Sequence, residues 1–201
     1  MQNASAQFLI PSHCKSKSII GQGGFSTYID FNTYRDKVQA CWLGKNIGGT
    51  LGVPFEGVRG FVPVQYYTHD LTKGVLPNDD LDLQLVWLRA AQLCGKALTA
   101  DILAEYWLNY IVGDWAEYGA AKNNLKAGLP VGIANRIDNL HKDSNGCFIR
   151  SEIWACLAPG RPEIAVKYAY EDGIIDHADE GLWGEFFAIL TLRNICGTFV
   201  V

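Results

Sequence analysis

Apolar residues recur every three or four positions along most of the chain beyond residue 33, which is the spacing of one buried face of an α-helix. In the clearest segment, Leu81, Leu85 and Leu88 form one apolar stripe, and a second stripe includes Trp87. No segment alternates apolar and polar residues convincingly, as a half-buried strand does. The pattern predicts an all-α protein with helices over residues 35–47, 79–94, 99–111, 117–126, 148–157, 162–177 and 180–195.

Residues that commonly flank helices mark where some of these segments start and end. Thr33 and Thr99 are predicted N-caps, because a hydroxyl oxygen can accept an unpaired N–H group of the first helical turn. Gly48, Gly49 and Gly52 are expected to end the first helix, since glycine is favoured just beyond a helix C-terminus. The helix over 79–94 is apolar around most of its circumference, which predicts that other elements surround it on all sides.

The composition indicates a folded domain with a large core. Hydrophobic residues make up 49% of the chain and charged residues 19%, so most of the chain is not expected to be disordered. The net charge of −4 argues against binding to a nucleic-acid backbone. No uninterrupted apolar run approaches the length of a membrane-spanning helix. Nucleic acids and membranes are therefore not expected partners.

The start of the chain differs from the rest. The first 29 residues contain no Asp or Glu, and they lack the apolar segment of a signal peptide. We therefore interpret residues 1–32 as a mobile N-terminal extension and residues 33–201 as one helical domain. None of the six cysteines forms a C-x-x-C pair, so we expect reduced, structural cysteines in a cytoplasmic protein rather than a zinc site.

Four residues with side-chain oxygens, Asn78, Asp79, Asp80 and Asp82, crowd the start of the helix over 79–94. One interpretation is ordinary capping, since an Asn N-cap and acids in the first turn suit the helix dipole. The other is a metal site, because carboxylates clustered at the edge of a core repel one another unless a cation compensates them. Hard oxygen ligands suit Mg²⁺, Mn²⁺ or Ca²⁺. The residues alone leave both interpretations open.

Three further segments carry groups that could bind or act on a ligand. Glu56 follows a glycine-rich segment; alone it is typical of a surface residue, but beside a metal cluster it becomes a general acid/base candidate. The Asn145-Gly146 turn is either a plain turn or a donor of backbone N–H groups to phosphate. His177 lies near several acids at a predicted helix end, where a histidine more often interacts with the helix dipole than with a ligand.

Taken in order, these motifs resemble the ADP-ribosylglycohydrolase family. Residues 48–56 are similar to the family's Gly-Asp-Ala-Leu-Gly segment and the catalytic Glu that follows it. Residues 78–81 are similar to its Thr-Asp-Asp-Thr metal motif, and residues 144–150 to its Gly-Asn-Gly-x-x-Met-Arg loop for phosphate and ribose. Asp176-His177 loosely matches a Thr-His segment. The resemblance spans about residues 33–188.

The resemblance implies an orthogonal multi-helix bundle and a hydrolase that removes ADP-ribose from a small molecule or a protein by cleaving a ribosyl C–N or C–O bond. It also implies two divalent ions, Mg²⁺ or Mn²⁺. The roles it implies are proton transfer by Glu56, substrate binding by Gly52, Asn145, Gly146, Arg150 and His177, and metal ligation by Asn78, Asp79, Asp80 and Asp82.

The chain departs from the family pattern at several positions. Gly49 stands where the family usually has Asp, and Asn78 and Leu81 replace two threonines. The family closes its dinuclear site with a late Asp-x-Asp-Thr motif, but no Asp-x-Asp-[Ser/Thr] follows Asp82 in this sequence. We therefore expect an incomplete domain, resembling the N-terminal half of such an enzyme, with some apolar faces left exposed.

Two other interpretations stay open. An all-α prenyl-diphosphate enzyme would need the spacing Asp-Asp-x-x-Asp, but Leu83 occupies the last position of that motif. A non-catalytic fragment or pseudoenzyme, which binds ADP-ribose or only packs as a helical module, would be consistent with the missing acidic motif.

Overall fold

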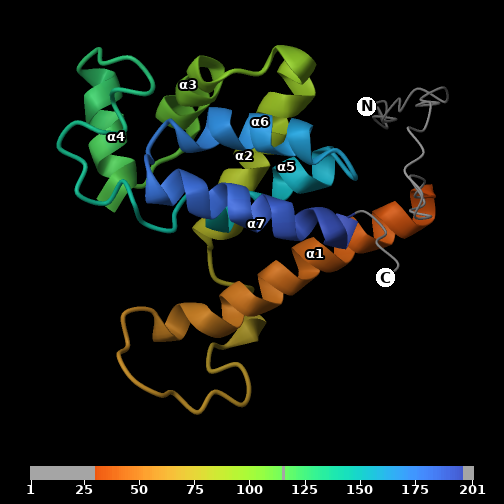
Figure 1. Cartoon of the computed structure of the whole chain (residues 1–201). Helices are drawn as coiled ribbons and strands as arrows, with labels where there is room; N and C mark the ends of the chain where they lie inside the picture. The colour runs from red at the N-terminus through yellow and green to blue at the C-terminus, as the bar shows by residue number, and fades with distance from the viewer. Residues whose placement is uncertain (1–29, 115, 197–201) are drawn as a thin grey trace, which may run out of the picture.

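The structure is a computed structural model that describes residues 30–114 and 116–196 (Figure 1). Within these residues the backbone forms seven α-helices and no strand, which confirms the predicted all-α class. Most of the predicted N-terminal extension lies outside the described residues. Among the described helices, none is both long and apolar enough to cross a membrane. The helices are α1 (Phe31–Gly52), α2 (Asp79–Cys94), α3 (Ala100–Tyr110), α4 (Ala116–Lys126), α5 (Glu152–Leu157), α6 (Pro162–Gly173) and α7 (Glu180–Cys196).

Tryptophans from three helices form the centre of the core. Trp87 of α2, Trp107 of α3 and Trp154 of α5 are each at most 1% exposed. The rings of Trp87 and Trp107 lie 5.7 Å apart, so α2 and α3 are joined through direct aromatic contact. In Figure 1, α6 and α7 run side by side across one face of this core, and α1 lies along its lower edge. The core therefore holds the first turn of α2 at the border between the helical body and α1.

The first helix begins earlier than predicted. Its N-cap is Asp30, whose carboxylate accepts hydrogen bonds from the N–H groups of Asn32 at 3.0 Å and Thr33 at 3.1 Å. The prediction that Thr33 is the N-cap is therefore wrong, and its hydroxyl instead donates to Asp30. A carboxylate at this position has the additional advantage of a favourable interaction with the positive end of the helix dipole.

The first helix also ends later than predicted, because it continues through Gly48, Gly49 and Gly52. Glycine lowers helix stability by about 1 kcal/mol relative to alanine, but it does not prevent helical geometry. A 3₁₀ turn, Val53–Phe55, follows directly and contains Pro54 in its first positions. Residues 56–78 then project from the helical body in Figure 1. Glu56 is thus carried at the end of a continuous helix.

The second helix is not surrounded on all sides, contrary to the prediction. Leu85 and Leu93 are more than half exposed, whereas the polar Gln84 is almost completely buried. Apolar residues are also exposed on α7, where Trp183 and Phe187 are mostly accessible to solvent. Exposed apolar faces were expected from the sequence, but the prediction placed too much of α2 in the interior.

Two later helices are shorter than predicted. The segment 148–157 divides into a 3₁₀ turn, Phe148–Arg150, and α5, while α6 stops at Gly173 rather than continuing to residue 177. Asp176 and His177 therefore lie beyond the end of α6. Their side chains are drawn into a buried polar cluster, described below, that a continuous helix would not form.

A carboxyl group of α7 is buried without an ion pair among the described residues. Glu185 is fully buried, and neither of its oxygens has a hydrogen-bond partner among the described residues. Burial raises the pKa of Glu185 well above its usual value, and the negative charge of Asp172 raises it further. The folded protein therefore binds a proton at this position more tightly than the unfolded chain does.

We expect the free energy of unfolding to fall as the pH rises above the usual pKa of a glutamate. In that range the unfolded chain releases the proton of Glu185, whereas the folded protein still binds it. Replacing Glu185 with Gln should remove this part of the pH dependence and leave the variant more stable than wild type at alkaline pH. Urea unfolding at a series of pH values measures the effect. The exposed Glu105→Gln is the control and should follow the wild-type curve; an equally steep curve for Glu185→Gln would contradict the assignment.

Candidate functional site

The first turn of α2 is built by an asparagine cap. The Asn78 side chain accepts a hydrogen bond from the N–H group of Asp80 at 2.9 Å, which confirms the capping role that its position suggests. One oxygen of Asp79 also accepts from this N–H group, at 3.1 Å. The cap and the core fix the first turn, so the carboxylates of Asp79, Asp80 and Asp82 start from a rigid backbone.

A chain of buried polar contacts supports this turn from behind. The Gln84 amide donates to the carbonyl oxygen of Asp80 at 2.7 Å and to Glu152 Oε2 at 2.9 Å. The other oxygen of Glu152 forms an ion pair with Lys45 of α1, at 2.6 Å. Sequence reasoning missed these three supporting residues. The available signal was Gln84 itself, a polar residue on an otherwise apolar face of α2.

The acids at this turn interact unfavourably with one another. Burial raises the pKa of Asp80 above its usual value. The negative charges of Asp79, Glu152 and Glu56 raise it further, against the opposing effect of the Lys45 ammonium. A cation at this position would favour the charged form of Asp80.

Two cavities that share lining residues bring most of the predicted site residues together. The first, of about 400 Å³, is lined by Glu56, Asn78, Asp79 and Asp82 among polar residues, and by apolar residues of α2 and α3. The second, of about 370 Å³, again contains Glu56 and Asn78. Gly52 and Asp80 also line it. The tertiary structure therefore places the predicted general acid/base beside the acidic turn of α2.

A third, smaller cavity connects the acidic turn with the predicted phosphate turn. It measures about 140 Å³ and is lined by Asp79, Asn145 and Gly146, together with Glu117 and Tyr118 of α4. Tyr118 also lines the first cavity. Sequence reasoning missed Glu117 and Tyr118. Nothing in their local pattern indicates a site, because their proximity to Asp79 depends on how α4 packs.

Arg150 lies behind the Asn145-Gly146 turn and lines none of these three cavities. Its guanidinium is fully buried and donates to Asp172 at 2.9 Å, to both oxygens of Asp176 at 2.7 and 3.0 Å, and to the Gly146 carbonyl oxygen at 3.1 Å. Burial alone would lower the pKa of Arg150, but the two carboxylates raise it well above its usual value. Burial would raise the pKa of Asp176, but the Arg150 guanidinium and the neighbouring His177 side chain lower it to about 2. Arg150 thus fixes the turn through Gly146.

His177 is likewise buried, at the back of the same turn. Its Nε2 lies 3.1 Å from the Ser144 hydroxyl and 3.7 Å from Glu117 Oε1. Its Nδ1 lies 2.9 Å from Asp176 Oδ1, but off the line required for a hydrogen bond. At Gly146, an added Cβ would lie 2.2 Å from Glu117 Oε1, so a side chain at this position would displace the Glu117 carboxylate. The structure thus brings His177 close to Gly146, with the His177 side chain fully buried.

Two departures from the family pattern compensate each other in space. A Cβ at Gly49 would lie 1.7 Å from the Asn78 amide nitrogen, so the asparagine side chain fills the volume that a side chain at position 49 would need. Gly49 on α1 and Asn78 before α2 are far apart in sequence but adjacent in the fold. The absence of a side chain at Gly49 therefore leaves the space that the Asn78 side chain occupies.

Replacing Gly49 with Ala should lower the free energy of unfolding by about 1–2 kcal/mol, because Asn78 must move and weaken the cap of α2. The control is Gly44→Ala on the same helix, where an added Cβ meets no atom within 4 Å. That control should stabilise the protein by about 0.5–1 kcal/mol through helix propensity alone. Chemical denaturation distinguishes the two signs; stabilisation by both substitutions would refute the clash.

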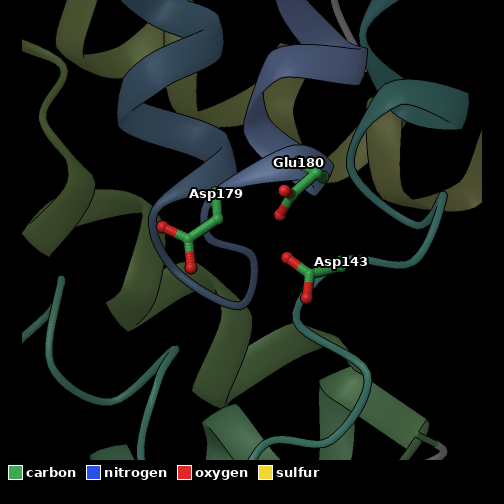
Figure 2. Close-up of side chains that lie close together, drawn as sticks. All are labelled: Asp143, Asp179 and Glu180. Carbon is green, nitrogen blue, oxygen red and sulfur yellow. The ribbon is translucent and has the colours of Figure 1, made fainter.

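A second acidic cluster lies at the start of α7. The carboxylate oxygens of Asp143, Asp179 and Glu180 lie within 4.8 Å of one another (Figure 2). Lys142 already forms ion pairs with Asp143 at 2.8 Å and with Asp179 at 2.9 Å. Arg136 pairs with Asp179 at 3.0 Å. Because the chain's own cations compensate these charges, we assign no metal to this cluster.

The side-chain types at the start of α2 are those that a hard divalent cation prefers. These side chains offer carboxylate and amide oxygens, which Mg²⁺ and Mn²⁺ prefer, and the like charges around Asp80 disfavour its ionised form without a cation. Asp79, Asp80 and Asp82 do not form a group with ligand atoms within 4.8 Å of one another, as the described acids at α7 do. The turn thus supplies separated oxygen ligands on one side of a cavity.

A protein-family model described as ADP-ribosylglycohydrolase matches residues 30–197, which is most of the chain. This match confirms the resemblance predicted from the motifs. No curated protein and no solved structure matches the chain.

Proposed function

The chain belongs to the ADP-ribosylglycohydrolase family, and on that basis we propose that its site removes ADP-ribose from modified small molecules or proteins by hydrolysing a ribosyl C–N or C–O bond. The observation that carries the proposal is the position of Glu56. It lines two cavities, and residues of the acidic turn of α2 line the same two cavities. A third cavity extends from Asp79 to the Asn145-Gly146 turn, which gives room for a second part of the ligand.

Glu56 is the proposed proton-transfer group. Cleavage of a ribosyl bond builds oxocarbenium-like character on the sugar, and a carboxylate at the cavity wall can take a proton from the attacking water. Glu56 is exposed at the end of α1, where it can reach solvent and ligand without disturbing the core. Its position depends on Gly52 and the 3₁₀ turn Val53–Phe55 that precedes it.

Asn78, Asp79, Asp80 and Asp82 are the proposed ligands for Mg²⁺ or Mn²⁺. When bound, such ions would orient the ribose hydroxyls and polarise a water molecule. The carboxylates of this turn contribute the negative charge, and its support by Gln84 keeps the donors in place.

The Asn145-Gly146 turn is the proposed binding site for the diphosphate of ADP-ribose. Arg150 supports this function indirectly, because its described hydrogen bonds go to Asp172, Asp176 and the Gly146 carbonyl oxygen. His177 contacts the same turn through Ser144. We therefore propose that Arg150 and His177 shape the turn, while Asn145 and Gly146 face the ligand.

Two measurements test the proposed function. Titration calorimetry with Mg²⁺ or Mn²⁺ should show binding to the wild-type chain and a large loss of binding in the Asp79→Ala, Asp80→Ala double variant. Release of ADP-ribose from ADP-ribosyl-arginine or ADP-ribosyl-serine peptides should require the same metal and stop on chelation. Equal titration curves for wild type and the double variant would exclude the metal site.

A non-catalytic module that binds ADP-ribose is a second candidate. It is favoured by the separation of the acids at α2, which do not gather as closely as the described acids at α7. Under this alternative, ADP-ribose should bind to the chain, but no release from the modified peptides should occur at any metal concentration.

A further inference from the structure

A buried tyrosine from α4 reaches the acidic turn of α2. The Tyr118 hydroxyl lies 3.5 Å from Asp79 Oδ2 and donates to it. Tyr118 lines the cavities on both sides of Asp79, namely the one that contains Glu56 and the one that contains Gly146. We propose that Tyr118 is a positioning residue that orients the Asp79 carboxylate for a divalent cation. This inference rests on the metal site of the proposed function.

The position of the Tyr118 ring is set by the core. The ring packs edge-on against Trp107, with ring centres 5.1 Å apart. The Arg150 guanidinium lies 4.8 Å from the Trp107 ring and 5.8 Å from the Tyr118 ring. These contacts come from α3 and from the segment before α5, so three parts of the chain fix one hydroxyl group. Tyr118 therefore connects the buried ion pairs of Arg150 to the acidic turn.

The hydroxyl is suited to donate rather than to accept from Asp79. A tyrosine hydroxyl carries a proton that it can donate, whereas a carboxylate oxygen accepts. The second oxygen of Asp79 accepts a hydrogen bond from the N–H group of Asp80 at 3.1 Å. The two oxygens of Asp79 are thus restrained by two different partners, one by the helix backbone and one by α4. Their remaining lone pairs are available to a cation.

The size of the effect follows from the geometry. Removing a group that orients a metal ligand typically weakens metal binding by 10- to 100-fold. A distance of 3.5 Å is long for a hydrogen bond between two oxygens, so Tyr118 restrains Asp79 less firmly than a closer partner would. The expected loss therefore lies near the lower end of this range, at about 10-fold.

The test compares Mn²⁺ binding by the wild-type chain and the Tyr118→Phe variant. Phenylalanine keeps the ring and its contact with Trp107 but removes the hydroxyl. Calorimetry should show about a 10-fold weaker affinity, and the paramagnetic resonance spectrum of bound Mn²⁺ should change because the ligand geometry changes. The matched control is Tyr110→Phe, which removes an exposed hydroxyl from the wall of the same cavity and should leave both measurements unchanged.

An Asp79→Asn variant and a thermal unfolding curve complete the experiment. If Tyr118 acts through Asp79, adding Tyr118→Phe to Asp79→Asn should cause no further loss of affinity. All titrations are made well below the unfolding midpoint of each variant, so that a change in stability does not appear as a change in binding.

The outcomes separate the two hypotheses. Equal affinities for the wild type and Tyr118→Phe, with a clear loss in Asp79→Asn, would overturn the role of Tyr118 and leave the metal site intact. Failure of the wild type to bind Mn²⁺, or equal binding by Asp79→Asn, would overturn the metal site of the proposed function. A loss of affinity equal to that of Tyr110→Phe would also overturn the role of Tyr118.

Discussion

Replacing Arg150 with Met is expected to lower the free energy of unfolding by about 3–5 kcal/mol, because the substitution leaves two buried carboxylates without their cation. Asp172 and Asp176 are both fully buried and both pair with this guanidinium. A loss of this size is a large fraction of the stability of an ordinary domain, which is about 5–15 kcal/mol. Urea unfolding at neutral pH measures it.

Two further variants show whether the effect arises from buried charge. Arg136→Met removes a cation from the partly exposed pair with Asp179, and it should cost only a small fraction of the loss at Arg150. Adding Asp176→Asn to Arg150→Met should recover part of the lost stability, since it removes one uncompensated carboxylate. A small effect at Arg150, or no recovery in the double variant, would show that the carboxylates are not ionised in the folded protein.

The second large effect is expected on catalysis. Under the proposed function, Glu56→Gln should reduce the rate of ADP-ribose release by about 100- to 10,000-fold, because the amide cannot exchange a proton with water in the transition state. Glu56 is exposed, so its substitution should leave the unfolding curve unchanged. Release from ADP-ribosylated peptides at saturating metal is the measurement.

The exposed Glu105 on α3 provides the matched control, since Glu105→Gln makes the same chemical change away from the three cavities. It should retain the wild-type rate. Metal affinity should also persist in Glu56→Gln if the cation is held by the acids of α2. If Glu56→Gln kept the full wild-type rate, another group would carry out the proton transfer.

The acidic turn shows how far local pattern reaches. Asn78 is the N-cap of α2 and Thr99 the N-cap of α3, as the sequence indicates, because capping depends on a side chain and on N–H groups only two or three residues away. The start of α1 was predicted incorrectly for an equally local reason: Asp30 accepts the N–H groups of Asn32 and Thr33, so the helix begins before Thr33.

The sides of α2 show where local pattern fails. Leu85 and Gln84 are neighbours, and hydrophobicity alone would place the leucine inside and the glutamine outside. The structure does the reverse, since Gln84 satisfies the Asp80 carbonyl and Glu152 across the fold. A buried polar residue is stable only where its hydrogen-bond partners are present, and two of the partners of Gln84, the Glu152 carboxylate and the N–H group of Ile153, come from α5.

The sequence by itself determined the helices, the acids at the start of α2 and the order of the family motifs, because each depends on residues within one or two helical turns. The tertiary structure decided which of those residues meet. It placed Glu56 beside Asp79, and Tyr118 between Asp79 and Gly146. It also buried Arg150, whose guanidinium donates to the Gly146 carbonyl oxygen. The physical reason is that packing and the burial of charge act between segments far apart in the chain, where periodicity carries no information.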